Sequence, residues 1–94
     1  MLKPEHHDGE APVQIVLYTL STCGWCKKTK AFLNELGVAY DYIDVDLLEG
    51  EEAAEATKEI VKLNPSCSFP TLVVNQTQCI VGFQEDKIRE VIGK

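Results

Sequence analysis

Two cysteines separated by two residues, Cys23 and Cys26, are the part of this chain best suited to chemistry. That spacing lets the two sulfurs meet in a small disulfide ring without moving the backbone. The pair lies between an apolar run, Val13 to Tyr18, and a segment with helical periodicity that continues to Leu36. The pattern predicts thiol–disulfide redox chemistry at the first turn of a helix.

The predicted helix places the two sulfurs in different surroundings. Its apolar stripe consists of Cys26, Thr29, Phe32, Leu33 and Leu36. Cys26 is therefore expected to point into the core. Cys23 lies off the stripe at the N-cap, where unpaired N–H groups and the positive end of the helix dipole favour a thiolate. We expect Cys23 to be the nucleophile and Cys26 the resolving thiol.

Lysines on the same helix are candidates for electrostatic support of the thiols. Lys27 lies four residues after Cys23 and Lys30 lies four after Cys26, so both amines project near the sulfurs. The alternative is a solvated face shared with Lys28, which is the usual role of a charge run. The sequence leaves both interpretations open.

Composition and charge limit the class of protein. The 94 residues are enough for one domain with one core. The net charge of −6 argues against nucleic acid and against an anionic membrane surface as partners. No stretch approaches the roughly 18 apolar residues of a membrane span, and the first twelve residues lack the apolar core of a signal peptide. We expect a cytoplasmic monomer.

The remaining pattern predicts an α/β domain over residues 13–94, preceded by a flexible lead over Met1 to Pro12. The predicted elements are a strand over 13–18, the dithiol helix closed by Gly37, a strand over 38–45, a helix over 51–63, a hairpin over 70–81 with its turn at 75–77, and a closing helix over 85–92. The first two strands form a parallel βαβ unit, with the second strand at a sheet edge. The order βαβ, α, ββ, α gives a mixed four-stranded sheet flanked by helices.

Four cysteines also allow a metal or iron–sulfur carrier as the alternative function. Cys23 and Cys26 would then need Cys67 or Cys79, which lie twelve residues apart and form no second close pair. Cys79 falls in a predicted strand and is interpreted as a small buried hydrophobic residue. Cys67, three residues before Pro70, is either an inert loop cysteine or a third redox thiol. We expect no bound metal and no bound cofactor.

From Val13 to Gly93 the chain resembles glutaredoxins of the thioredoxin-fold superfamily. The likeness rests on Ser21-Thr22-Cys23-Gly24-Trp25-Cys26, Phe69-Pro70-Thr71 and Val81-Gly82-Phe83. It implies a protein-disulfide reductase that serves electron transport and acts on disulfide-containing proteins or glutathione mixed disulfides. It also implies that the Phe69–Pro70 bond is cis and that Pro70 faces the dithiol. The residues implied at the substrate surface are Gly24, Trp25, Phe69, Pro70, Gly82 and Phe83.

The chain departs from the glutaredoxin pattern around the dithiol. Leu20 stands where the family usually has a basic residue that binds a glutathione carboxylate, and Val81-Gly82 stands where it tends to have two glycines. Gly24-Trp25 replaces the usual Pro-Tyr between the cysteines. The resemblance implies either glutathione or an enzyme of the thioredoxin-reductase type as electron donor, and these departures favour the reductase.

Overall fold

The computed structural model describes residues 5–11, 13–66 and 68–93. Its elements, in chain order, are β1 (Glu5–His7), β2 (Ile15–Thr19), α1 (Gly24–Leu36), β3 (Tyr40–Asp44), the short 3₁₀ helix η1 (Val45–Leu47), α2 (Gly50–Leu63), β4 (Thr71–Val74), β5 (Gln78–Val81) and α3 (Glu85–Ile92). The strands form one sheet in the order β1-β3-β2-β4-β5. β2 and β3 are parallel, and the other neighbouring strands are antiparallel. The predicted α/β class, parallel βαβ unit and sequence of helices are confirmed.

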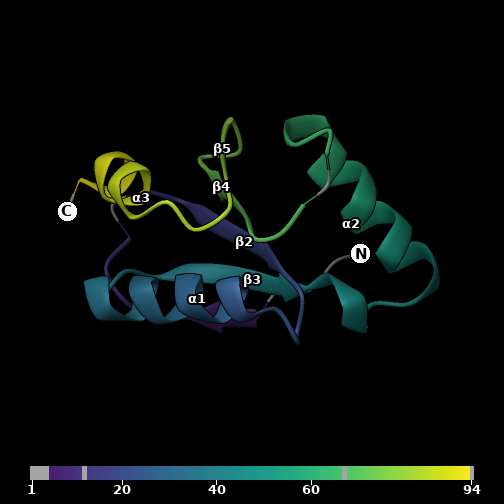
Figure 1. The fold of residues 1–94 in the computed structure, drawn as a ribbon, viewed down its shortest axis with the longest axis horizontal. Helices are drawn as coiled ribbons and strands as arrows, with labels where there is room; N and C mark the ends of the chain where they lie inside the picture. The colour runs from purple at the N-terminus through teal and green to yellow at the C-terminus, as the bar shows by residue number, and fades with distance from the viewer. Residues whose placement is uncertain (1–4, 12, 67, 94) are drawn as a thin grey trace.

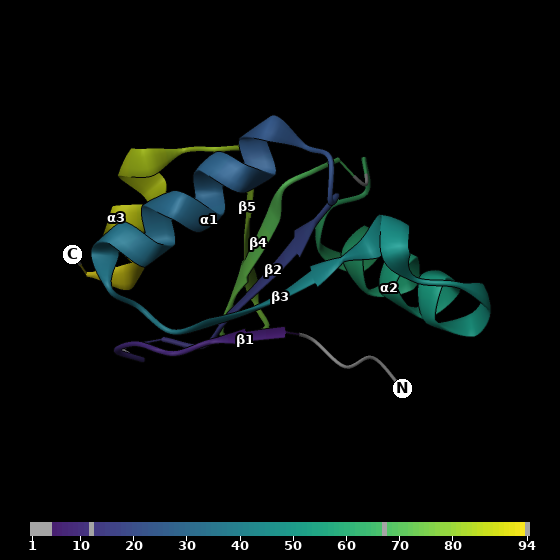
Figure 2. The ribbon, with the colours of Figure 1, turned by 90° about the horizontal axis from the view of Figure 1, so that it is seen from below.

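Helices cover both faces of the sheet, with α1 and α3 on one face and α2 on the other (Figures 1 and 2). The alternation of β2 explains both layers. Ile15 and Leu17 are buried in the core beneath α1 and α3. Val16 and Tyr18 face the other way and line a cavity with residues of α2. The core also contains Phe32, Leu33, Val38, Tyr40, Leu72, Val74, Ile80, Ile88 and Ile92.

The N-terminal segment differs from the predicted flexible lead over Met1 to Pro12. Glu5–His7 forms β1 and pairs antiparallel with β3, where His6 lies opposite Asp41. The sheet therefore has five strands instead of four, and the predicted edge strand, 38–45, is an interior strand. β1 has polar side chains and no apolar alternation, so the pattern that predicts strands is absent from it.

Residues after β1 run close to the C-terminal end of α1. A Cβ on Gly9 would lie 2.7 Å from the carbonyl oxygen of Gly37, so only glycine fits there without a backbone shift. The N–H of Glu10 donates to the carbonyl of Gly37, and the N–H of Ala39 donates to the carbonyl of Glu10. These contacts tie the chain before β2 to the connection between α1 and β3.

The local signals of α1 and of the hairpin are confirmed. Cys23 is the N-cap of α1, and Gly37 ends the helix with φ of 72°. β4 and β5 pair across a loop at 75–77, as predicted. Across the described ranges, the structure has no helix long and apolar enough to cross a membrane.

Candidate active site

The predicted site residues converge at the end of the sheet where β2 leads into α1. β4 lies antiparallel to β2, with Tyr18 opposite Thr71, so Pro70 lies beside Thr19 at that end. The N–H of Gly82 donates to the carbonyl of Pro70 at 2.9 Å, which brings the end of β5 to the same place. Three segments distant in sequence therefore surround the start of α1.

Cys23 is partly exposed and caps α1 with its sulfur. The sulfur accepts a hydrogen bond from the N–H of Cys26 at 3.1 Å. The N–H of Cys23 donates to the carbonyl of Leu20 at 3.1 Å, which closes a tight turn before the helix. The sulfur therefore lies at the positive end of the helix dipole, beside a backbone N–H donor. Such surroundings suit a nucleophilic thiol.

Cys26 is completely buried, as the apolar stripe of α1 predicted. Burial and, next, the hydrogen bond with the Cys23 thiol raise the pKa of Cys26 to about 12. The backbone of Leu20 and the charge of Lys30 act in the opposite direction. Cys23 and Cys26 are both free thiols here. The dithiol thus consists of one sulfur that solvent reaches and one that it does not.

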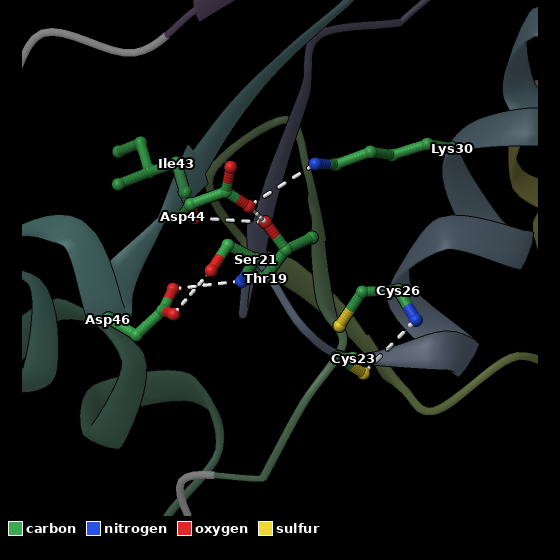
Figure 3. A network of polar contacts seen from close by, with 8 residues as sticks. All are labelled: Thr19, Ser21, Cys23, Cys26, Lys30, Ile43, Asp44 and Asp46. Atoms are coloured by element: carbon green, nitrogen blue, oxygen red, sulfur yellow. Dashed lines mark hydrogen bonds and ion pairs between the residues drawn. The ribbon is translucent and has the colours of Figure 1, made fainter.

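Lys30 belongs to a half-buried polar network beside the dithiol (Figure 3). Its Nζ lies 3.2 Å from Oδ1 of Asp44 and 4.1 Å from the centre of the Tyr42 ring. The same Oδ1 accepts a hydrogen bond of 2.5 Å from Oγ1 of Thr19, which is buried at the end of β2. Strand 38–45 was predicted to lie at a sheet edge, but β1 continues the sheet beyond it and the carboxylate of Asp44 is half-buried against Lys30.

Lys27, the other lysine predicted to support the thiols, is exposed. Its backbone N–H donates to the carbonyl of Cys23. Among the residues that the structure describes, its ammonium group makes no hydrogen bond and no ion pair. Lys27 therefore fits the alternative of a solvated face, whereas Lys30 does not.

Trp25 and Phe83 form an aromatic surface next to the start of α1. Trp25 is 56% exposed, and its ring lies 6.2 Å from that of Phe83. Phe83 meets Phe32 edge to face at 5.6 Å. Nζ of Lys28 lies 4.6 Å from the centre of the Trp25 ring. The surface is therefore aromatic with one ammonium group over the Trp25 ring, and Phe83 connects it to the core.

Hydrogen bonds to Asp46, which sequence reasoning missed, hold the loop before Cys23. Ser21 donates to the Asp46 carboxylate from its N–H at 2.8 Å and from its hydroxyl at 2.5 Å. These hydrogen bonds lower the pKa of Asp46. Both residues are visible in the sequence, but their pairing depends on η1 lying beside the loop.

A second missed residue, Asn64, holds the loop before Pro70. Its buried side-chain amide donates to Oγ1 of Thr71 at 3.0 Å. Oγ1 of Thr71 in turn donates to the carbonyl of Ser68 at 2.6 Å. In the sequence, Asn64-Pro65 follows the helix predicted over 51–63 and is typical of a helix end, but it does not indicate the contact of Asn64 with Thr71.

The structure also places the remaining predicted residues. The Phe69–Pro70 bond is cis, Pro70 is buried and Phe69 is partly exposed. Cys79 is partly buried in β5, and its Sγ donates to the carbonyl of Leu63 at 3.2 Å. Cys67, the possible third redox thiol, lies outside the described residues.

The alternative of a metal carrier is not favoured. Within residues 5–11, 13–66 and 68–93, no group of three or more His, Cys, Asp and Glu side chains is arranged to hold a metal ion. The Cys23 and Cys26 thiols interact with one another, and the Cys23 sulfur also accepts a hydrogen bond from the N–H of Cys26. This arrangement suits exchange between two sulfurs.

Known proteins are similar to this chain in sequence or in structure. The glutaredoxin family model matches residues 15–79. A glutaredoxin crystal structure from Methanosarcina mazei Go1 is 48% identical and covers 99% of this chain and 90% of its own, with a TM-score of 0.92. Methanoredoxin from Methanosarcina acetivorans is 52% identical over 92% of this chain and 90% of its own, with a TM-score of 0.88. The gene 56 protein of Mycobacterium phage D29 is 35% identical over 78 residues, 83% of this chain and 81% of its own.

Proposed function

The chain belongs to the glutaredoxin family of thiol–disulfide oxidoreductases, and we propose that it reduces disulfides with Cys23 as nucleophile and Cys26 as resolving thiol. The contrast between the two sulfurs carries this proposal. Cys23 is partly exposed and accepts a helix N–H, whereas Cys26 is fully buried and has a pKa of about 12. An incoming disulfide reaches the first sulfur, and the second sulfur is left to attack the first.

The reaction consists of two exchanges. In the first, the Cys23 thiolate attacks one sulfur of the substrate disulfide, a Cys23–substrate disulfide forms, and the other substrate sulfur leaves and takes up a proton. In the second, the Cys26 sulfur attacks the Cys23 sulfur, and the bond between Cys23 and the substrate sulfur breaks. The proton of Cys26 passes to the departing substrate thiolate. Two electrons thereby pass from the dithiol to the substrate, and Cys23 and Cys26 end as a disulfide.

For substrates we propose disulfide-containing proteins, with glutathione mixed disulfides as the smaller candidates. The exposed ring of Trp25, backed by Phe83, supports a protein substrate, because aromatic surface beside the nucleophile offers apolar contact area. For the electron donor we propose an enzyme of the thioredoxin-reductase type. Leu20, which supplies no charge for a glutathione carboxylate, supports that choice.

Trapping of the mixed disulfide tests the assignment of roles. We expect Cys26→Ser to accumulate a covalent complex with a model disulfide protein, because the second exchange is blocked, and Cys23→Ser to form none. Intact-mass spectrometry measures both. Cys79→Ser is the matched control and should turn over like the unchanged protein. The Sγ of Cys79 donates to the carbonyl of Leu63, at the end of α2, and a serine hydroxyl can make the same hydrogen bond.

Two outcomes would contradict the proposal. A complex with Cys23→Ser but not with Cys26→Ser would reverse the two roles. Folded variants that form no complex at all, together with an unchanged protein that reduces no disulfide, would reject the activity. Circular dichroism of each variant establishes that it is folded.

A further inference from the structure

Lys30 is held near the resolving cysteine from two sides. It lies one helical turn after Cys26 on α1, so both side chains leave the helix on the same side (Figure 3). That side faces the ends of β2 and β3, at Thr19 and Asp44. Its side chain is 22% exposed. The ammonium group is fixed by Asp44 at 3.2 Å and by the face of Tyr42 at 4.1 Å. A surface lysine would instead extend its ammonium group into water.

The carboxylate half of this pair is anchored in the sheet. Oδ1 of Asp44 accepts a hydrogen bond from Oγ1 of Thr19, and that hydroxyl also lies 3.2 Å from the carbonyl oxygen of Ile43. Thr19 is fully buried, so the anchor is shielded from water. Asp44 therefore fixes the position of the Lys30 charge.

Of the Lys30–Asp44 ion pair, the ammonium group of Lys30 is the part that acts on Cys26. Burial is the main cause that raises the pKa of Cys26, and the Cys23 thiol raises it further. The backbone of Leu20 and the ammonium group of Lys30 lower it, and the carboxylate of Asp44 is not among the causes. Lys30 is thus the charged side chain that favours the Cys26 thiolate. In the mixed disulfide the Cys23 sulfur no longer ionises, and Leu20 and Lys30 remain.

We propose that Lys30 is a positioning residue for the resolving step, in which its ammonium group stabilises negative charge on the Cys26 sulfur as that sulfur attacks Cys23. The inference rests on the proposed function and concerns its second exchange alone. The Cys26–Cys23 bond forms while the bond from Cys23 to the substrate sulfur breaks. The proton of Cys26 passes to the leaving thiolate, and Lys30 keeps its own proton throughout.

Single-turnover reaction of the reduced protein with dithiodipyridine, an uncharged aromatic disulfide, separates the two exchanges. Each exchange releases one equivalent of absorbing thiopyridone, first on attack by Cys23 and then on attack by Cys26. We expect Lys30→Met to slow the second phase about threefold to tenfold at neutral pH and to raise its pH midpoint, because each tenfold corresponds to one pKa unit. The first phase should stay within about twofold. Lys30→Arg keeps the charge and should restore most of the second phase.

Asp44→Asn separates charge from packing. The amide oxygen can still accept from Thr19, but the negative charge is lost, so the second phase should be unchanged or faster with a lower pH midpoint. Lys58→Met, on the exposed face of α2, makes the same charge change away from this network and is the matched control.

The outcomes are distinguishable. Equal slowing of the second phase by Lys30→Met, Lys30→Arg and Asp44→Asn would assign the network to packing and overturn the inference. An unchanged second phase in Lys30→Met would overturn it as well. A wild-type protein that shows no first phase would instead overturn the proposed function. Tryptophan fluorescence establishes that each variant is folded.

Discussion

At the scale of single residues, Phe83 determines how the aromatic surface beside Cys23 is held. Phe83 is partly buried between the exposed ring of Trp25 and the buried ring of Phe32. Tilted and edge-to-face aromatic contacts contribute about 0.5–1.5 kcal/mol each beyond the burial of their surface. Trp25 is 56% exposed, and its contact with Phe83 connects it to the core.

Phe83→Ala is therefore expected to lower the free energy of unfolding by roughly 1–3 kcal/mol, less than the ~3–5 kcal/mol of a fully buried phenylalanine. Trp25 is the only tryptophan of the chain, so its fluorescence reports on the site directly. Its emission should shift to longer wavelength as water replaces the Phe83 ring. Urea unfolding followed by fluorescence measures both effects. Phe83→Leu, which retains most of the apolar volume, should lose less than half as much stability.

A loss of stability without any change in Trp25 emission would contradict this account. It would mean that Phe83 supports the core through Phe32 while the indole ring is held independently. The two rings would then be neighbours without a common function.

At the scale of elements, α1 could be predicted almost completely because its signals are local. The N-cap at Cys23, the burial of Cys26 and the end at Gly37 all depend on residues within a few positions of one another. The roles proposed for the two sulfurs follow from this one helix. The hairpin of β4 and β5 was predictable for the same reason.

Contacts between distant elements could not be predicted from local patterns. β1 pairs with β3, where His6 lies opposite Asp41, 35 residues further along the chain. The residues of β1 are polar, so the segment has no apolar alternation that would predict a strand. The pairing of Lys30 with Asp44 likewise depends on α1 packing beside β3. The sequence contains these polar residues, but propensity and periodicity say nothing of which of them meet.

β1 is held in part by a contact that titrates. Nδ1 of His6 lies 2.6 Å from Oδ1 of Asp41, and its Nε2 lies 3.0 Å from the carboxylate of Asp8. The hydrogen bond to Asp41 is the main cause that raises the pKa of His6 above 6.5. Because the pKa is raised on folding, the contact stabilises β1 fully below the unfolded value of 6.5 and is lost as the pH rises through the folded-state pKa.

We therefore expect the β1 amides to be better protected from hydrogen exchange at about pH 5.5 than at about pH 8.5, after correction for intrinsic exchange rates. His6→Gln keeps a hydrogen-bonding side chain that does not titrate, and it should remove the difference. If the pH dependence persists in His6→Gln, another group holds the strand.

At the scale of the whole molecule, the net charge of −6 contrasts with the apolar residues near the dithiol. Leu20 and Trp25 flank Cys23 and carry no charge. Physiological salt screens charges beyond about 8 Å, so the overall charge has little effect on a small anion at this end of the molecule. We therefore expect contacts made locally, at positions such as Leu20, to decide how well this site binds glutathione.

Leu20→Lys is expected to accelerate recycling of the oxidised protein by glutathione. One charge-assisted hydrogen bond to a carboxylate contributes about 1.5–3 kcal/mol, which corresponds to roughly tenfold to hundredfold in binding. Leu20 is partly exposed, so a lysine there reaches solvent without disturbing the core. Leu20→Gln has a similar size without charge and should leave the rate within about threefold. Stopped-flow reduction of the Cys23–Cys26 disulfide by glutathione measures both variants.

The unchanged protein should in contrast be recycled faster by a thioredoxin reductase than by glutathione. Gly24-Trp25 between the cysteines resembles the thioredoxin motif, which favours a potential nearer ~−270 mV than the ~−200 to −230 mV of glutaredoxins. That gap of about 40–70 mV is roughly 2–3 kcal/mol for two electrons, enough to make glutathione a poor donor. Equilibration against glutathione buffers measures the potential. A potential above about −220 mV together with efficient recycling by glutathione would contradict the choice of a reductase as donor. If Leu20→Lys then brought no gain in the rate, glutathione would not require a cation at position 20.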